Sequence, residues 1–195
     1  MMKTETALTL ASSSPRRREL LQTLGIPFTI QTSDVDETTA PDLSPSDVVE
    51  ELAVRKARAV ASTQKEGVVL GSDTIVVLEE QILGKPADEA DAFRMLTMLQ
   101  GREHTVYSGV ALIDAASGRV EVSHSRTQVR IRPLTQAEIE SYIATREPMD
   151  KAGSYAIQGI GATIVEGIMG DYFTVVGLPL SLTAQMLSRF GITVL

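Results

Sequence analysis

Hydrophobic positions in the first third of the chain alternate between short apolar runs and helical stripes. Thr6 to Ala11 predicts a short buried strand, and Pro15 to Leu24 predicts a helix with its leucines on one face and Gly25 at its end. Phe28 to Thr32 predicts a second strand, and a long amphipathic helix is expected from Ser44 to about Ser62. Strands that alternate with helices are typical of the α/β class.

The most apolar segment lies in the middle of the chain. Val68 to Leu78 is apolar on both faces except at Ser72, Asp73 and Thr74. Such a segment predicts a central strand, covered on both faces, that is interrupted at a functional point. The sequence EEQILGKP is expected to turn the chain after this strand.

The second half of the chain shows neither a repeat nor a low-complexity tract. Its pattern predicts, in order, a helix from Ala87 to Gln100, a hairpin of Thr105 to Asp114 and Arg119 to Arg132, a helix opened by a capping box of Thr135 and Glu138, two short strands around Ile164 and Phe173, and a last helix from Pro179 to Arg189. We expect one α/β domain over residues 1–195, with the long antiparallel hairpin as a secondary lobe.

Charge and composition narrow the classes of partner. Eighteen basic and 25 acidic residues give a net charge of −7, which repels nucleic-acid backbones and anionic membranes over most of the surface. No apolar run approaches the ~20 residues of a membrane span, and the segment ALTLA is too short for the apolar region of a signal peptide. We therefore expect a cytoplasmic protein with neither a nucleic-acid nor a membrane partner.

The rarity of cysteine and histidine excludes several kinds of site. The chain has no cysteine, which excludes disulfides, thiolate nucleophiles and cysteine-based zinc sites. His104 and His124 are its two histidines, so a metal site built from several histidines is excluded as well.

The stretch SSSPRRRELL places positive charge where a helix is already positive. Ser14 can cap the helix and Pro15 suits its first turn, yet arginines follow, and each costs roughly 0.3–1 kcal/mol against the helix dipole unless an anion is near. Ser12, Ser14, Arg16 and Arg17 could bind a phosphate together with free backbone N–H groups. The alternative is a capped surface helix whose arginines are solvated.

Three acidic positions are candidates for catalysis or metal binding. Asp73 lies in an apolar strand, where an ionised carboxylate requires a partner, although it could also cap a neighbouring turn at a bulge. Asp34, Asp36 and Glu37 cluster in a polar loop, and carboxylate oxygens are ligands that Mg²⁺ prefers. Loop acids are also commonly just solvated.

Two lysines and a glutamine complete the set of candidates. Lys56 lies among apolar residues of a helix, where it could simply extend toward water, and Lys85 lies in the tight LGKP turn, which could direct it into a cleft. Gln158 lies among glycines, and its amide could contact a base edge or make a structural hydrogen bond.

These stretches together resemble the Maf family of nucleoside triphosphate pyrophosphatases. The matching segments are LASSSPRRRELL, SDVDE, ELAVRKA, GSDTIV, LGKP, DKAGSYAIQG and VVGLPL, in the family's order from residue 10 to residue 180. The resemblance implies an elongated mixed β-sheet flanked by helices, with a deep central cleft. It also implies hydrolysis of nucleotides to the monophosphate and pyrophosphate, a divalent metal cation such as Mg²⁺ or Mn²⁺, and a homodimer.

Transferred position by position, the resemblance assigns roles to residues of this chain. The residues that correspond to phosphate-binding positions are Ser12, Ser14, Arg16, Arg17, Lys56 and Lys85. Glu37 and Asp73 correspond to metal-binding positions, and Asp73 also corresponds to the proton acceptor. The positions linked to substrate choice are Arg16, Thr74 and Gln158. The combination of SDT and AIQG is similar to the sequence pattern of the family branch that acts on dTTP and UTP. Ser13 stands where relatives often have glycine, so the geometry of the phosphate loop could differ.

Two other classes of function remain as alternatives. A regulatory module of cell division could bind a nucleotide without hydrolysing it, but Asp73 would then have no role. A nucleic-acid-binding protein is suggested only by RRR and RTQVRIR, and the negative net charge and 4% aromatic content argue against it.

Overall fold

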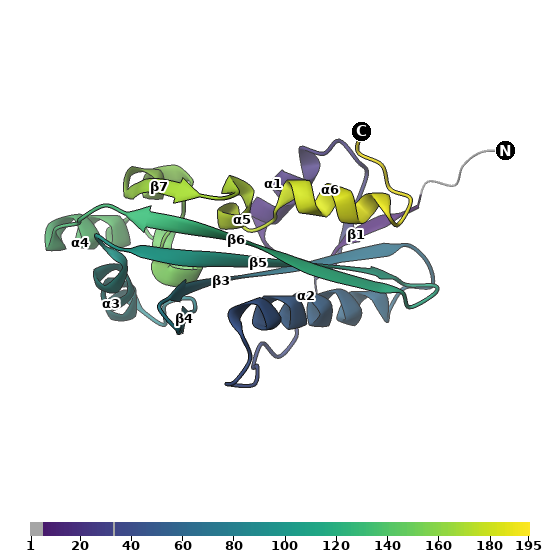
Figure 1. Cartoon of the computed structure of the whole chain (residues 1–195), viewed down its shortest axis with the longest axis horizontal. Coiled ribbons are helices and arrows are strands. Elements are labelled where there is room, and N and C mark those ends of the chain that lie inside the picture. The colour runs from purple at the N-terminus through teal and green to yellow at the C-terminus, as the bar shows by residue number, and fades with distance from the viewer. Residues whose placement is uncertain (1–5, 33) are drawn as a thin grey trace. The chain divides into compact units, whose positions relative to one another are not determined.

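The computed structural model describes residues 6–32 and 34–195 (Figure 1). Ser33, the first residue of the SDVDE segment, lies outside the described residues. The chain forms two compact units. Unit 1 comprises the chain through Asp73 together with Ser108–Ser125 and Gly177–Leu195, and unit 2 comprises Thr74–Tyr107 and Arg126–Val176. Whether the two units act as the single expected domain stays a prediction.

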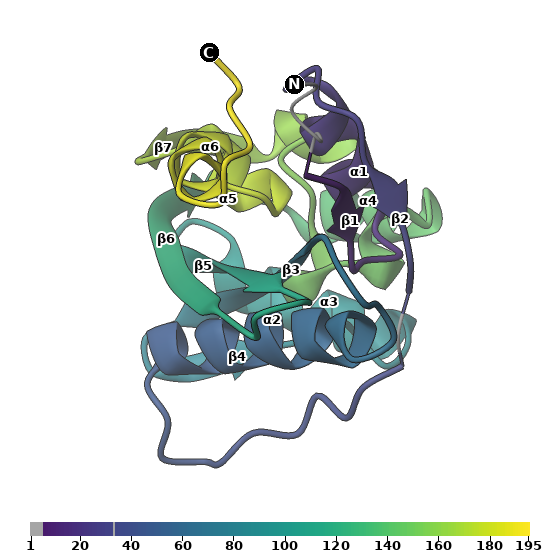
Figure 2. The same ribbon diagram turned by 90° about the vertical axis from the view of Figure 1, so that its right-hand side faces the viewer.

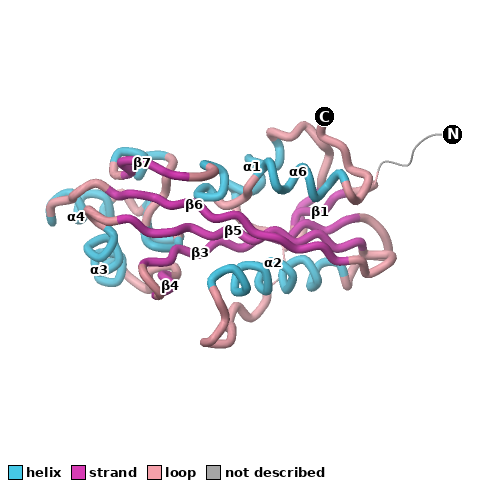
Figure 3. Tube along the Cα trace, in the orientation of Figure 1, coloured by secondary structure: helices cyan, strands magenta, loops and turns pink. Residues whose placement is uncertain are grey.

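The strands of the described residues belong to a mixed sheet (Figure 3). The strands are β1 (Leu8–Leu10), β2 (Thr29–Ile30), β3 (Val68–Leu78), β4 (Gln81–Leu83), β5 (Glu103–Asp114), β6 (Val120–Ile131) and β7 (Val165–Met169). Among the described residues they form one seven-stranded sheet of order β2-β1-β3-β5-β6-β7, with β4 paired to β3. β1 is parallel to β2 and β3, whereas the β3–β4 and β6–β7 pairs are antiparallel. The expected mixed α/β fold with flanking helices is confirmed.

The helices begin at the residues that the capping signals predict. Ser14, Ser44 and Thr135 each accept a hydrogen bond from a backbone N–H of the first turn, and Thr135 forms the full capping box with Glu138. The helices are α1 (Pro15–Gln22), α2 (Pro45–Ala61), α3 (Glu89–Leu99), α4 (Gln136–Ala144), α5 (Tyr172–Val176) and α6 (Leu180–Ser188), with 3-10 helices η1 (Glu147–Asp150), η2 (Ala152–Ser154) and η3 (Gly159–Thr163).

In unit 1, α2 and α6 cover opposite faces of the sheet (Figure 2). The helix α2 approaches the strands closely because two glycines face it. A Cβ at Gly71 would lie 2.3 Å from the carbonyl oxygen of Ala53, and a Cβ at Gly109 would lie 2.3 Å from that of Val49. Only glycine permits this spacing, which brings the side chains of α2 within reach of β3.

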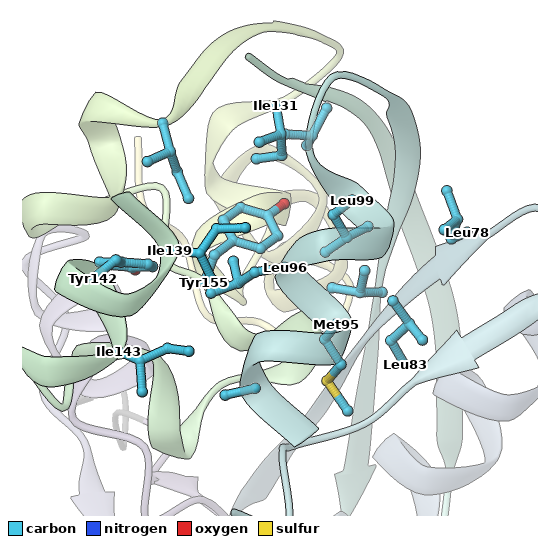
Figure 4. Close-up of a cluster of buried hydrophobic side chains, with 14 of the residues drawn as sticks. Leu78, Leu83, Met95, Leu96, Leu99, Ile131, Ile139, Tyr142, Ile143 and Tyr155 are labelled. Atoms are coloured by element: carbon cyan, nitrogen blue, oxygen red, sulfur yellow. The ribbon is translucent and has the colours of Figure 1, made fainter. Parts of the chain in front are cut away.

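Unit 2 has its own hydrophobic core, built mainly from α3, α4 and strand residues. Figure 4 shows side chains of this core, among them Leu96 and Leu99 of α3, Ile139 and Ile143 of α4, and Tyr155. His104 is buried beside this core, where its Nε2 lies 2.6 Å from the Tyr155 hydroxyl oxygen. Among the described residues, His104 Nδ1 has no hydrogen-bond partner. Burial lowers the pKa of His104 from 6.5 to about 4, so the imidazole is neutral at pH 7.

The structure corrects three expectations. β3 runs without interruption through Asp73, because side-chain ion pairing satisfies the carboxylate and the backbone ladder continues. Phe173 lies in α5 rather than in a strand. EEQILGKP turns the chain as expected, and it also contains the short antiparallel strand β4. The hairpin of β5 and β6 is confirmed, but both strands belong to the sheet, with β5 between β3 and β6, and do not form a separate lobe.

None of the helices in the described part of the chain is both long enough and apolar enough to cross a membrane.

Candidate functional site

In unit 1, the ammonium group of Lys56 joins two carboxylates. Its Nζ lies 2.6 Å from Asp73 Oδ1 and 2.8 Å from Glu37 Oε1. The side chains of Lys56 and Asp73 are 16% and 10% exposed, whereas that of Glu37 is 57% exposed. The cluster therefore has a buried side at β3 and an open side at the acidic loop.

Alternation along β3 places Asp73 where Lys56 can contact it. Residues two apart in a strand share a face, so Asp73 lies on the face of Gly71, which α2 covers. Lys56 precedes Ala57, whose backbone nitrogen would lie 2.7 Å from a Cβ at position 71. The close approach of α2 at Gly71 thus supplies the partner that the buried carboxylate requires.

The serine loop and α1 contribute positive charge to the same cluster. Ser12 Oγ accepts from Ser14 N at 3.2 Å, and Ser14 Oγ caps α1 by accepting from Arg17 N at 3.4 Å. Burial lowers the pKa of the Arg17 guanidinium below its ordinary value; Asp73 and Glu37 oppose this shift, and Arg16 adds to it. Arg17 therefore interacts electrostatically with both carboxylates, and Arg16 lies beside it at the start of α1.

Charge in this cluster does not balance. Lys56 and Arg17 face Glu37 and Asp73, and Arg16 adds a further positive charge beside Arg17. α1 also begins here with no acidic residue in its first turn, so the positive end of its dipole adds to the excess. The arrangement favours binding of an anion, and the role of these residues in phosphate binding stays a prediction.

The backbone carbonyl of Gly177 connects α1 to β3. No role for it was expected from the sequence. The carbonyl oxygen of Gly177 accepts from Arg17 Nε at 2.8 Å and from the Ser72 hydroxyl at 3.2 Å. Ser72 is fully buried and points away from the face that carries Asp73. One feature of the sequence could have indicated this contact. Gly177 lies in VVGLPL, a segment that resembles the family pattern but to which no role was assigned.

Arg55 is a second residue that the sequence analysis missed. Its Nη1 donates to the carbonyl oxygens of Asp36 and, at 2.9 Å, Thr38, which ties the acidic loop to α2 beside Lys56. The carboxylate of Asp36 accepts from Thr38 N at 2.8 Å, and hydrogen bonds from Thr38 lower its pKa. Asp36 therefore closes a turn while Glu37 reaches Lys56, and Asp34 is exposed.

Three predicted site residues belong to unit 2. Thr74 follows Asp73 in β3 and, by alternation, points to the opposite face of the strand. Lys85 is exposed after β4. Gln158 is partly buried directly before η3, and its side chain does not cap that helix. The predicted roles of these three residues in binding a nucleotide stay predictions.

The carboxylates around Lys56 fit a hard divalent cation. Glu37 and Asp73 direct one oxygen each toward a single cationic group, and Mg²⁺ is commonly held by one or two carboxylates together with substrate phosphates. In the described part of the chain, no three acidic or histidine side chains gather as a metal site. A cation here would therefore depend on oxygens from a ligand or water.

Known proteins match this chain over nearly its whole length. The family profile described as Maf-like protein matches residues 7–190. A dTTP/UTP pyrophosphatase from Moorella thermoacetica is 56% identical over 187 residues, covering 96% of each chain. One from Pelotomaculum thermopropionicum is 53% identical over 188 residues, covering 96% of this chain and 98% of that protein. One from Desulforamulus reducens is 50% identical over 185 residues, covering 95% of this chain and 97% of that protein.

A solved structure of a HAM1 protein from Coxiella burnetii is a more distant match. It is 18% identical and covers 65% of this chain and 73% of its own, with a TM-score of 0.49. This similarity is too low to support a conclusion about activity.

Proposed function

The chain belongs to the Maf-like protein family, and we propose that it hydrolyses dTTP and UTP to the nucleoside monophosphate and pyrophosphate. The observation that carries the proposal is the 56% identity to a dTTP/UTP pyrophosphatase over 96% of both chains. More than half of the aligned residues are identical over nearly the full length of both chains, which supports the same reaction for this chain.

The charge cluster of unit 1 supports roles for particular residues. Asp73 accepts a proton from the water that attacks the α-phosphorus, since it is the most buried carboxylate of the cluster and lies beside Lys56 and Arg17, the groups proposed to bind the phosphates. Arg16, Arg17 and Lys56 stabilise negative charge on the leaving pyrophosphate, with Ser12 and Ser14 as further donors. Lys85 is proposed as another phosphate contact.

Glu37 and Asp73 are the residues that would hold the divalent cation, Mg²⁺ or Mn²⁺. When bound, such an ion supplies positive charge to the phosphates. Lys56 contacts both carboxylates in this structure, so its ammonium keeps their oxygens directed at one point. Lys56 thereby orders the two ligands and also supplies charge for the polyphosphate.

Base choice is proposed to rest on Gln158, with Thr74 and Arg16 contributing. The Gln158 amide can accept a hydrogen bond from N3–H and donate one to O4 of uracil or thymine, a pair that cytosine cannot match in the same orientation. We also propose that the protein acts in the cytoplasm and as a homodimer.

A nucleotide panel tests the reaction. The protein is incubated with canonical and modified nucleoside triphosphates and Mg²⁺ or Mn²⁺, and the products are separated by anion-exchange chromatography. The expected products from dTTP and UTP are the monophosphate and pyrophosphate. Diphosphate and phosphate would place the attack at another phosphorus, and tight binding without any product would favour the regulatory nucleotide-binding module.

A further inference from the structure

Two side chains of unit 2 hold the backbone on both sides of Gln158. The Tyr142 hydroxyl donates to Glu147 Oε1 at 2.8 Å and accepts from Ala156 N at 3.1 Å. Glu147 accepts from Ile160 N at 3.0 Å through Oε2 and from Gly161 N at 2.8 Å through Oε1. Tyr142 therefore fixes the chain two residues before Gln158, and Glu147 fixes it two and three residues after Gln158.

This hydrogen-bonded pair is well suited to positioning the loop. Tyr142 belongs to the core cluster of unit 2 and is 4% exposed (Figure 4). Desolvation by itself would raise the pKa of the Glu147 carboxyl, but the hydrogen bonds from Tyr142, Gly161 and Ile160 outweigh it and lower that pKa. The carboxylate is thus ionised and able to accept all three donors.

The glycines beside Gln158 fit closely around the same two side chains. A Cβ at Gly159 would lie 2.4 Å from Glu147 Oε2, and Gly159 has a φ of +65°. A Cβ at Gly161 would lie 2.5 Å from the Tyr142 hydroxyl oxygen and 2.0 Å from the Ala156 carbonyl oxygen. The glycines of AIQGIG therefore serve close packing against Tyr142 and Glu147, and the loop has one available path.

From this geometry we infer that Tyr142 and Glu147 are positioning residues for base selection: they hold the backbone around Gln158 so that its amide meets the base in one orientation. The inference rests on the proposed function, in which Gln158 contacts the base. Discrimination between two bases by an amide depends on orientation, because a reversed amide exchanges its donor and acceptor. Neither Tyr142 nor Glu147 needs to touch the nucleotide.

The test compares UTP with CTP in matched variants. Tyr142→Phe removes the hydroxyl that holds Ala156, and Glu147→Gln replaces one accepting oxygen with an NH₂ group that faces backbone donors. The controls are Tyr155→Phe, which loses a buried hydroxyl that faces His104, and Glu140→Gln, an exposed carboxylate of α4 that pairs with Gln136. For each variant, kcat and KM are measured for both nucleotides, Kd is measured in the presence of Mg²⁺, and the melting temperature is recorded.

The expected result is a selective loss of discrimination. In Tyr142→Phe and Glu147→Gln, the ratio of kcat/KM for UTP to that for CTP should fall about three- to tenfold, the range expected for one hydrogen bond. The fall should come mainly from a higher KM for UTP. Neither control should change the ratio. In the Gln158→Ala background, Tyr142→Phe should cause no further fall, because the two residues act through one contact.

Other outcomes overturn the inference and separate it from the proposed function. If Gln158→Ala lowers the ratio but Tyr142→Phe and Glu147→Gln lower kcat equally for both nucleotides, the pair is merely structural. If Gln158→Ala leaves the ratio unchanged, the base contact and this inference both fail, while hydrolysis stands. If no nucleotide is hydrolysed, the proposed reaction fails, and the ratio of Kd values for UTP and CTP still decides the inference.

Discussion

The charge cluster of unit 1 and the Gln158 loop of unit 2 are held in place by different kinds of interaction. Around Asp73, long charged side chains converge, and Lys56 contacts two carboxylates within 2.8 Å. Around Gln158, one tyrosine and one glutamate bind backbone N–H groups, and glycines leave no space for a Cβ. The first region supplies charge, whereas the second fixes the path of the backbone.

This difference predicts how each region responds to mutation. Removal of a charge from the unit 1 cluster leaves the backbone in place, so we expect losses of activity with small losses of stability. A change of shape in the unit 2 loop strains packed groups, so we expect losses of stability or selectivity. Variants of the unit 1 cluster and of the unit 2 loop test this contrast, and the buried His104 of unit 2 adds a test by pH.

The strongest test of the unit 1 cluster is Asp73→Asn. The amide keeps the shape of the carboxylate but does not accept the proton, so turnover of dTTP should fall by at least about 100-fold, roughly 3 kcal/mol. Nucleotide affinity should change little. Steady-state kinetics and a binding titration measure the two quantities. Asp47→Asn, an exposed carboxylate at the start of α2, is the control. Near-normal turnover in Asp73→Asn would show that another group accepts the proton.

Unit 2 should respond to acid through His104. Its folded pKa of about 4 lies below the ordinary 6.5, so between these values the unfolded chain binds a proton that the folded chain does not. Stability due to this group is present above pH 6.5 and is lost as pH falls toward 4, a change of ~3 kcal/mol. Urea denaturation at several pH values should give a flatter pH dependence for His104→Gln than for the wild type. The same pH dependence of stability in both proteins would show that His104 is not the group responsible.

Gly161→Ala tests the packing of the unit 2 loop. The added methyl would lie 2.0 Å from the Ala156 carbonyl oxygen, so the backbone must shift, and the free energy of unfolding should fall by about 2 kcal/mol. Denaturant titration measures the loss. The matched control is Gly167→Ala in β7, where a Cβ meets nothing within 4 Å. Equal stability of the two variants would mean that the loop accommodates the methyl by moving.

Arg17→Lys separates charge from geometry in the unit 1 cluster. Lysine keeps the positive charge but loses the directed hydrogen bond from Nε to the Gly177 carbonyl oxygen. We expect kcat/KM for dTTP to fall about tenfold, with the midpoint of urea unfolding little changed. Arg18→Lys, at an exposed position of the same helix, is the control. Full activity in Arg17→Lys would show that the charge alone is sufficient.

Local patterns predicted most of the helices and strands but left some elements wrong. The capping box at Thr135 and the proline starts of α1 and α2 are confirmed, because a cap depends on residues within one turn. β4 was missed within EEQILGKP, since a three-residue strand has no clear period of its own. Phe173 was wrongly assigned to a strand because aromatic residues favour strands, whereas this one lies in the short helix α5.

The sequence by itself determined the order of the elements, their caps, and the set of charged residues available for a phosphate site. These follow from hydrophobic period and capping, which act between residues close in the chain. Only the tertiary structure decided that Lys56 contacts Asp73, 17 residues away, and that Glu147 holds Gly161, 14 residues away. Such contacts depend on how closely helices and loops pack, and the packing is set by space at residues such as Gly71 and Gly161 that no local pattern specifies.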